Sequence, residues 1–306
     1  MARTAAVIVT WEGGATTERC VGSLLAQDPP LDEIIVVDNA SSRAERERLS
    51  SSTGREAGVR LLLLEENRQF AGGLNAGGRV AFANGAERVL FLNNDTVFAP
   101  DALRWLGLAL DAHPRAGIVG PRVLYLDSPE RVLTAGEVHL LPLLCAPRSL
   151  LRPQASATSA YPVSGVMGCA MLVTRGCFAA VGGYSEEIEV YYEDVDFCLG
   201  ARAAGFDLLI EPRASAYHDG FRGFVRGLTP WAGFLKARNP WILMRRRAGV
   251  GSWLTFLPSY PLMIGASAVL YAARGRGDVS RALVRGAWAG LRAVCGVART
   301  PVGAPR

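Results

Sequence analysis

The sequence has 306 residues, half of them hydrophobic, which is enough for one large domain or for one domain plus an appendage. Its six cysteines lack CxxC spacing, which argues against a disulfide framework or a zinc site and predicts reduced, mostly buried thiols. The start shows no signal-peptide pattern, because the apolar run after Met1 is short and continues into polar sequence. We therefore expect this part of the protein to stay in the cytosol.

The net charge of +5 conceals an asymmetry along the chain. Residues 222–306 contain 14 Lys or Arg and a single acid, Asp278, whereas residues 1–221 contain 19 basic and 27 acidic residues, a net charge of −8. The acidic part is consistent with a cation site. The basic tail indicates an anionic partner surface, either membrane or nucleic acid.

The N-terminal half alternates predicted strands with predicted helices. Short, continuous apolar runs bounded by polar residues or glycine predict buried strands at 5–10, 33–38, 59–64 and 88–92. Helices are expected at 16–27, from Ser41, at 73–86 and from Pro100. This alternation predicts a mostly parallel sheet covered on both faces, with ligands bound beyond the carboxyl ends of its strands.

The rest of the chain is less regular. Residues 121–160 are expected to form loops with short strands, followed by a buried strand at 163–174, a helix at 193–204 and a strand at 206–210. Residues 248–273 contain no charged side chain and are flanked by arginines, Arg245–Arg247 on one side. Their length permits a membrane span, but two prolines interrupt the segment, so an in-plane helix or a helical pair packed on the main domain stays open.

Polar side chains follow the predicted strands at the edge where ligands are expected. Asn93, Asn94 and Asp95 follow the strand at 88–92, and an oxygen-rich turn of this kind suits Mg²⁺ or Mn²⁺ on a diphosphate, although it is also a common plain turn. Asp38 ends another strand and could accept from a ribose hydroxyl or a base N–H. In residues 67–75, glycines precede a helix, which favours either an approaching anion or close helix packing.

Acidic residues also cluster at the start of the predicted helix at 193–204. Glu193, Asp194 and Asp196 complement the helix dipole there, and the same dipole keeps a carboxylate ionised, as a general base requires. Because Asp194 and Asp196 are two residues apart, only one is expected to face a cleft. Tyr191 and Tyr192 form either an acceptor wall or part of the core. His218 follows a predicted strand and precedes a glycine-containing loop, where a metal or diphosphate role competes with a structural one.

Taken together, these segments resemble family 2 glycosyltransferases of the A-type nucleotide-diphospho-sugar fold, most closely the bacterial rhamnosyltransferase-like branch. The resemblance covers about residues 5–240, and its segments are VIVT, VVDNASS, NRQFAGGLNAG, FLNNDT, YYEDVDFCLGARAAGF, AYHDG and ARN. It implies an α/β, Rossmann-like mixed sheet flanked by helices as a catalytic domain over residues 1–240. Residues 241–306 are then expected to form a basic, apolar, helical segment that associates with a membrane.

The resemblance also implies roles for individual residues. Asp194 would be the catalytic base, next to Glu193. Asn93 and Asp95 would take the Asp-x-Asp positions that hold Mg²⁺ or Mn²⁺ on the diphosphate, and His218 would join them. The residues implied for nucleotide-sugar binding are Thr10, Trp11, Asp38, Asn67, Gly72, Asn75 and Asn94.

The activity that follows is inverting transfer of a sugar, with rhamnose as the leading candidate, from a nucleotide-diphospho-sugar to an acceptor hydroxyl. The acceptor is expected to be a saccharide or a lipid-linked saccharide, in cell-wall, cell-surface polysaccharide or glycolipid synthesis. The basic, apolar tail predicts attachment to the inner face of the cell membrane, and not to nucleic acid.

Three positions depart from the family pattern, and they keep alternatives open. Trp11-Glu12 replaces the usual Tyr-Asn, Asn93 replaces an acid, and Gly200 stands where an Arg is common. Asn93 leaves room for a catalytically impaired, glycosyltransferase-like binding protein, and the arginine-rich tail for a basic membrane- or nucleic-acid-binding protein. A nucleotidyltransferase would need a loop rich in glycine and lysine after the first strand, and residues 11–20 contain no lysine.

Overall fold

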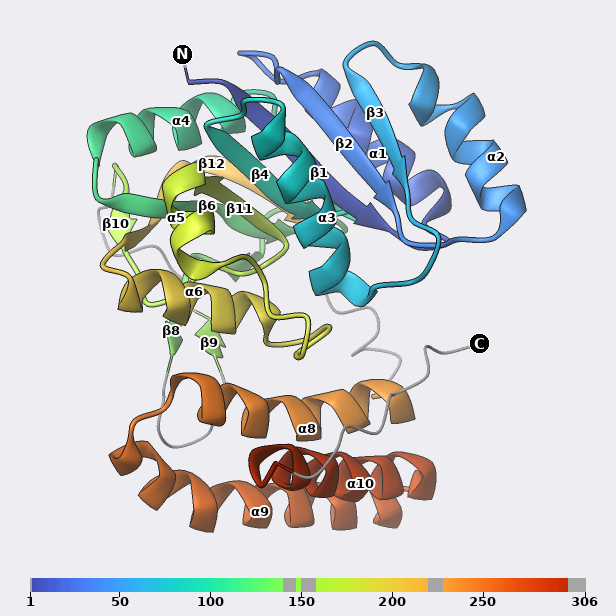
Figure 1. Cartoon of the computed structure of the whole chain (residues 1–306), viewed down its shortest axis with the longest axis vertical. Helices are drawn as coiled ribbons and strands as arrows, with labels where there is room; N and C mark the ends of the chain where they lie inside the picture. Colours follow the sequence, from blue (N-terminus) through green and yellow to red (C-terminus); the bar gives the residue numbers. More distant parts are fainter. Residues whose placement is uncertain (1, 140–146, 150–157, 220–227, 297–306) are drawn as a thin grey trace.

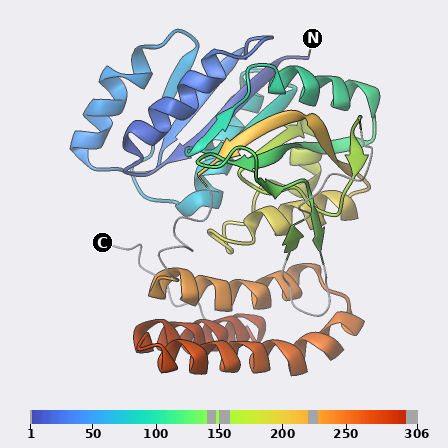
Figure 2. The same cartoon turned by 180° about the vertical axis from the view of Figure 1, so that it is seen from behind.

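The computed structural model describes residues 2–139, 147–149, 158–219 and 228–296. Its body is a ten-stranded sheet with helices on both faces, and the last three described helices form a separate layer beneath this body (Figure 1). The view from behind shows the same two parts (Figure 2). The α/β fold with a helical C-terminal segment agrees with the prediction.

The strands in the described residues are β1 (Thr4–Thr10), β2 (Glu33–Asp38), β3 (Val59–Leu63), β4 (Arg88–Asn93), β5 (Thr96–Phe98), β6 (Ala116–Tyr125), β7 (Val132–Thr134), β8 (Glu137–His139), β9 (Pro147–Ser149), β10 (Tyr161–Pro162), β11 (Ala170–Thr174) and β12 (Asp207–His218). The large sheet has the order β10-β12-β6-β11-β4-β1-β2-β3, with β5 paired to β12 and β7 to β6, while β8 and β9 pair separately. Strands β3, β2, β1 and β4 are mutually parallel, as the strand–helix alternation predicts. Strand β11 runs antiparallel to both of its neighbours.

The helices are α1 (Gly14–Leu25), α2 (Arg43–Ser51), α3 (Gln69–Ala83), α4 (Ala102–Ala112), α5 (Arg175–Val181), α6 (Glu193–Ala203), α8 (Pro230–Arg247), α9 (Val250–Ala273) and α10 (Gly277–Val294), with a short 3₁₀ turn η1 (Thr53–Arg55). Most lie within a few residues of their predicted positions. Helix α2 begins at Arg43, two residues later than expected, because Ser42 is its N-cap and accepts a bond from Glu45 N.

Side chains that alternate along the central strands build one core on each face of the sheet. In β1, Val7 and Val9 pack into the core beneath α3, whereas Ala6 and Ile8 pack into the core beneath α1 and α4. Alternation of this kind, with both faces apolar, produces the continuous hydrophobic runs seen in the sequence. Four of the five described cysteines are buried free thiols, Cys295 is exposed, and Cys145 lies outside the described residues.

The glycines of the segment 67–75 and beyond allow helix α3 to lie very close to the sheet. A Cβ atom at Gly73 would be 2.7 Å from Val9 Cγ1, and one at Gly77 would be 2.4 Å from Val7 Cγ1. The helix begins at Gln69, four residues before the predicted start, so the glycines belong to its buried face. Close helix packing, one of the two interpretations open from the sequence, explains these positions.

Two strands differ from the prediction in length. The expected strand at 163–174 is a strand only from Ala170, because residues before it turn through Gly165 and Gly168, whose N–H groups bond to Glu137 O and Asp194 Oδ2. The expected strand at 206–210 continues to His218, past an irregular register between Glu211 and Ser215. The second difference matters for the site, because the longer β12 brings His218 next to β5, opposite Thr96.

The helical layer has a core of its own. Trp241 of α8, Phe256 and Tyr260 of α9, and Leu283 of α10 are among its buried residues. Helix α9 runs unbroken through both prolines that were expected to interrupt it. The expected domain boundary at residue 240 falls inside α8, and the division into two domains remains a prediction.

The exposed side of α9 is apolar. Helix α9 exposes Val250, Leu254, Leu262 and Val269 by 70 % or more. By length and composition, α9 is the one described helix that qualifies as a candidate membrane span, and 22 % of its most apolar stretch is buried inside the protein.

The arginines before α9 do not flank it as a free basic cluster. Arg246 and Arg247 form ion pairs with Asp196 of α6, and Arg245 pairs with Glu187. Their charge is therefore directed toward the α/β body.

Candidate active site

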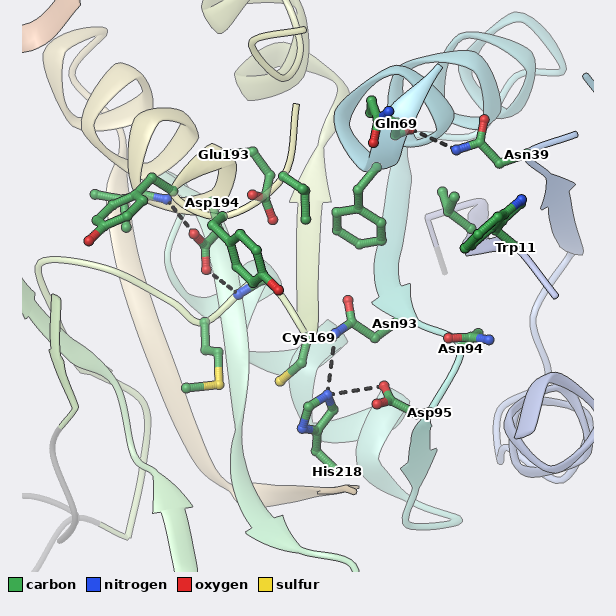
Figure 3. A pocket seen from close by; sticks show the side chains of 18 of the residues that line it. Trp11, Asn39, Gln69, Asn93, Asn94, Asp95, Cys169, Glu193, Asp194 and His218 are labelled. Carbon is green, nitrogen blue, oxygen red and sulfur yellow. Dashed lines mark hydrogen bonds and ion pairs between the residues drawn. The ribbon is translucent and has the colours of Figure 1, made fainter. Parts of the chain in front are cut away.

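A cavity of about 620 Å³ opens at the carboxyl ends of β1 and β4, where the parallel-sheet rule places ligands. Its walls come from the strand ends and the turns after them, from the loop before α6 and the start of that helix, and from α8. The lining residues are Val9, Trp11, Asn39, Asn67, Gln69, Phe70, Asn93, Asn94, Asp95, Glu137, Met167, Gly168, Cys169, Val190, Tyr191, Tyr192, Glu193, Asp194, Val195, His218, Trp231 and Lys236. Figure 3 shows Glu193 and Asp194 on one side of this cavity and Asn93, Asp95 and His218 on another.

Strand pairing brings His218 to the turn that contains Asn93 and Asp95. Strand β5 follows this turn directly and pairs antiparallel with β12, so that Thr96 lies opposite His218. His218 Nε2 is 3.0 Å from Asp95 Oδ1 and 3.2 Å from Asn93 Nδ2, and the three side chains point toward one another (Figure 3). The three residues predicted to hold a metal thus form one cluster, although 125 positions separate Asn93 from His218.

The donor atoms of this cluster fit a hard divalent cation that takes most of its ligands from a substrate. Asn93 Oδ1 is buried and accepts no hydrogen bond within the described part of the chain, and the buried Asp95 Oδ1 has His218 Nε2 as its nearby polar group. The described residues contain no group of three or more His, Cys, Asp or Glu side chains that would form a complete protein site. Mg²⁺ and Mn²⁺ are commonly held by one or two carboxylates together with substrate phosphates, and the cluster matches that arrangement.

Glu193 and Asp194 begin α6 and face the cavity with different environments. Asp194 Oδ2 accepts a bond from Gly168 N (2.9 Å) and Oδ1 accepts one from Val195 N (2.8 Å). Glu193 is buried, and its Oε2 has no hydrogen-bond partner among the described residues. Burial, reinforced by the negative charge of Asp194, raises the pKa of Glu193 well above its usual range. The pair therefore offers one oriented carboxylate and one carboxyl that favours its neutral form.

Asp196 points away from the cavity, in agreement with the helical spacing. Its side chain is fully buried and binds both Arg246 and Arg247 of α8. These contacts attach the start of α6 to the helical layer.

The loop that leads into α6 is held by main-chain contacts from α8. Glu189, Tyr191 and Tyr192 have positive φ angles of 69°, 63° and 74°, which non-glycine residues rarely adopt. Asn239, fully buried in α8, donates from its amide to the carbonyls of Ile188, Val190 and Tyr191 at 2.8–2.9 Å.

Arg238 extends the same attachment. Its guanidinium donates to Glu187 O and Ile188 O and pairs with Glu189 at 3.0 Å. Helix α8 thus fixes the unusual backbone that positions Tyr191, Tyr192 and the two acids after them.

Three of the residues predicted for nucleotide-sugar binding line the cavity. Trp11, just beyond β1, exposes 44 % of its surface, and its ring is open to a ligand. Asn94 donates to Thr17 Oγ1 at 3.1 Å while still lining the cavity, and Asn67 lines it from the loop before α3.

The other four lie outside the lining and make internal bonds or contacts. Thr10 Oγ1 is 2.9 Å from Thr17 Oγ1, and Asp38 is buried beside Arg46 at 2.9 Å. Asn75 bonds Tyr184 through both its amide and its oxygen, and a Cβ at Gly72 would meet the side chain of Arg68. Asp38 Oδ1 nevertheless accepts no bond within the described residues.

Sequence reasoning missed several lining residues. Glu137 comes from a segment expected to be loop, and Trp231 and Lys236 come from α8, where the charge pattern drew attention to the tail as a whole. The Arg238-Asn239 pair, present in the family resemblance, was the one available signal that α8 contacts the site. The loop predicted after His218, with Gly220 and Gly223, lies outside the described residues.

Comparison with known proteins bears on the family and the fold. A family model described as glycosyl transferase family 2 matches residues 5–178. The chain is 34% identical over 197 residues to the uncharacterized protein y4gI of Sinorhizobium fredii, covering 61% of this chain and 21% of y4gI. It is 28% identical over 232 residues to an N-acetylglucosaminyl-diphospho-decaprenol L-rhamnosyltransferase of Mycobacterium tuberculosis, covering 69% of this chain and 74% of the relative.

A solved structure supports the fold over nearly the whole chain. The mannosyltransferase PcManGT from Pyrobaculum calidifontis, in complex with GDP-Man and Mn²⁺, superposes with a TM-score of 0.59 at 18% identity. The match covers 94% of this chain and 87% of that one. At this identity the likeness establishes the fold.

Proposed function

The chain belongs to glycosyl transferase family 2, and on that premise we propose that it transfers a sugar, with inversion, from a nucleotide-diphospho-sugar to an acceptor hydroxyl in glycan synthesis. One observation carries the proposal: a single cavity brings Asp194 and Glu193 within the same walls as Asn93, Asp95 and His218. A base and a diphosphate-binding cluster on different walls are what a direct displacement at an anomeric carbon requires.

Asp194 is the proposed general base. Each of its carboxylate oxygens accepts one backbone N–H and keeps a further lone pair, so the group is held in place and still able to accept a proton. The acceptor hydroxyl transfers its proton to Asp194, its oxygen forms a bond to the anomeric carbon, and the bond from that carbon to the diphosphate oxygen breaks. Glu193, whose raised pKa favours the neutral carboxyl, donates a hydrogen bond to a sugar hydroxyl in this arrangement.

Asn93, Asp95 and His218 are the residues that would hold a divalent cation against the donor diphosphate. A bound Mg²⁺ or Mn²⁺ there would neutralise negative charge on the leaving diphosphate. Support comes from the buried Asn93 Oδ1, which accepts no hydrogen bond among the described residues, and from the Mn²⁺ in the PcManGT complex. Trp11 is proposed to stack on the nucleotide base, and Asp38 and Asn75 are proposed to act from behind the cavity by holding the backbone around it.

Rhamnose, from its thymidine or uridine diphosphate, is the proposed donor sugar. The M. tuberculosis relative transfers L-rhamnose to N-acetylglucosaminyl-diphospho-decaprenol, according to its name, and this supports both the sugar and a lipid-linked saccharide acceptor.

A panel of nucleotide-diphospho-sugars tests the donor site. The purified chain is incubated with each donor in the presence of Mg²⁺, Mn²⁺ or EDTA. Two quantities are measured: the release of nucleoside diphosphate and the melting temperature of the protein. We expect one donor to raise the melting temperature only with metal and to be hydrolysed slowly. Absence of a shift with every donor, in a chain that melts cooperatively, would favour the catalytically impaired binding protein instead.

The helical layer is the proposed membrane-contacting part, on the cytoplasmic face. Helix α9 buries Phe256, Tyr260 and Ile264 against its neighbours and exposes apolar side chains on the other side, which favours an in-plane orientation over a span. On α10, Arg281, Arg285, Trp288 and Arg292 are exposed and recur at helical spacing. Arginine and tryptophan together suit an anionic lipid–water interface.

Vesicle sedimentation tests this contact. The vesicles contain a mixture of anionic and neutral phospholipids. The double variant Leu254→Glu with Leu262→Glu is expected to have a partition coefficient at least tenfold lower than that of the wild type, because it places charge in the apolar face. Leu108→Glu, an exposed leucine on α4, is the matched control. Equal partition of the double variant and of Leu108→Glu would contradict membrane contact through α9. If the protein binds no vesicles but changes the electrophoretic mobility of duplex DNA in a salt-sensitive way, nucleic acid would be the favoured partner.

A further inference from the structure

Lys236 is the only lysine in a sequence that contains 33 Lys and Arg residues together. It lies on α8, and its side chain lines the cavity next to Tyr191 and Trp231. The ammonium is 4.7 Å from the centre of the Tyr191 ring, and this ring is 6.0 Å from that of Trp231. The one amine side chain of the protein is thus placed in the active-site wall, within an aromatic setting.

The charges around the cavity set Lys236 apart. Asp95, Glu137, Glu193 and Asp194 contribute four carboxyl groups to the described lining, and Lys236 is the only Lys or Arg among those lining residues. Burial lowers its pKa to about 8, so at neutral pH the group is mostly a cation in a partly desolvated position. A cation there is well suited to an anionic ligand that enters the cavity.

Lys236 also stands where the cavity meets the helical layer. Tyr260 of α9 donates from its hydroxyl to Lys236 O at 3.0 Å, so the backbone of Lys236 contacts the layer while its side chain contacts the cavity. Helix α8 lies between the α/β body and α9 in both views (Figures 1 and 2). A ligand anchored at the outer surface of α9 and reaching toward Asp194 would have its polar junction near this helix.

We propose that Lys236 binds the phosphate group that joins saccharide to lipid in the acceptor, and so sets the enzyme's preference for phosphate-linked lipid acceptors. The inference rests on the proposed function and deepens it. The donor diphosphate is assigned to the separate cluster of Asn93, Asp95 and His218, which leaves the lysine for the second anion of the reaction. A lysine serves this role as a compact point charge on a flexible stem, which adapts to a phosphate approaching along an aromatic wall.

The single lysine permits a direct test on the unmodified protein. The wild-type chain is acetylated with N-hydroxysuccinimidyl acetate at pH 8, and the rate at Lys236 is followed by peptide mass spectrometry. Geranylgeranyl diphosphate, geranylgeraniol, inorganic pyrophosphate and UDP with Mn²⁺ are added separately, in the same detergent. We expect geranylgeranyl diphosphate to slow acetylation at least tenfold, because a bound phosphate both covers the amine and stabilises its ammonium form, and we expect geranylgeraniol to have little effect.

Several outcomes would overturn the proposal. Equal protection by the alcohol and the diphosphate would mean that the lipid chain, not the phosphate, covers Lys236. Equal protection by pyrophosphate would remove the lipid-linked source, and full protection by UDP with Mn²⁺ would assign Lys236 to the donor. Two variants give an independent measure: Lys236→Met is expected to weaken geranylgeranyl diphosphate binding at least tenfold, and Lys236→Arg by less than threefold.

The result is separable from the donor assay. Protection in this experiment needs no glycosyl transfer, so a chain that fails with every donor but shows phosphate protection keeps the Lys236 site and loses the proposed transferase activity. A chain that hydrolyses a donor but shows no selective protection keeps the proposed activity and loses this inference.

Discussion

The two walls of the active-site cavity are constructed in different ways. The proposed donor wall consists of Trp11 just beyond β1 and of short polar side chains at the end of β4, fixed by the ladder of a parallel sheet, with His218 added through β5. The opposite wall is the loop at 186–192 with the start of α6, and it is held by side chains of α8 that lie about 50 positions away in the sequence.

The family match divides along the same line. It covers residues 5–178, which include Asn93 and Asp95 but end before the loop, α6 and α8. The shared part of the molecule therefore contains Asn93 and Asp95 of the proposed diphosphate cluster, whereas His218, the proposed base and the proposed acceptor side lie beyond the match. Changes in the donor wall should act locally, whereas changes in the α8 wall should affect stability and catalysis together.

The largest effect is expected at the base. Asp194→Asn keeps an oxygen for the Gly168 N–H but removes the proton acceptor, so turnover should fall roughly 10²- to 10⁴-fold while donor binding is retained. Steady-state transfer and donor affinity are measured together. Asp207→Asn, which changes a half-buried aspartate on β12 that pairs with Arg115, is the control. Near-wild-type turnover in a folded Asp194→Asn protein would reject the assignment.

The next effect tests whether α8 holds the second wall. Asn239→Ala leaves the carbonyls of Ile188, Val190 and Tyr191 without their donor, which we expect to lower the free energy of unfolding by about 2–4 kcal/mol. Catalysis should fall as well, since the backbone before Glu193 loses its support. Urea denaturation and turnover of Asn239→Ala are compared with those of Asn84→Ala. The control removes a half-buried amide that bonds to Glu33 far from the cavity. If the two variants behave alike, the α8 attachment is not what positions the acids.

This contrast also explains which parts were predictable from the sequence. The parallel strands were found because each is a short apolar run, buried on both faces in β1, β2 and β4, and such runs leave a local signal. The position of His218 relative to Asn93 depends on a strand that runs to residue 218, past an irregular register near Pro212, and the local pattern ended the strand at 210. The cluster was nevertheless predicted, because the family resemblance supplied what the local pattern lacked.

The second wall was less accessible to prediction. Within residues 189–192, three non-glycine residues have positive φ, and no sequence pattern indicates this conformation. Asn239 likewise resembles any asparagine in a helix until its three carbonyl partners are known. Similarly, Asp38 and Asn75 have side chains that often bind ligands. In the structure, however, Asp38 pairs with Arg46, and Asn75 bonds to Tyr184 and Glu186. A polar residue near a strand end does not indicate by itself whether its partner is a ligand or the protein.

Lys236→Met should separate function from stability on the acceptor side. Because burial lowers the pKa of Lys236 from 10.5 to about 8, the charged form is disfavoured in the folded state, and this cost is complete below pH 8 and absent above 10.5. The nearby titratable groups are Tyr191, whose own pKa burial raises, and Glu193 and Asp194. The variant should gain about 1–2 kcal/mol in unfolding free energy at pH 7, a gain that shrinks as the pH rises toward 10. Lys236→Arg, which keeps the charge, should show no such gain.

The smallest effect concerns the donor wall, where Asn93 stands in place of an acid. Asn93→Asp adds a carboxylate beside Asp95 and His218, so the Mn²⁺ concentration for half-maximal activity should fall several-fold and the loss of activity in EDTA should deepen. Asn94→Asp adds the same charge one residue away, on a side chain directed toward Thr17. If both variants change the Mn²⁺ requirement equally, general negative charge near the cavity is responsible. If only Asn93→Asp does so, the side chain at position 93 is a metal ligand whose amide sets the present affinity.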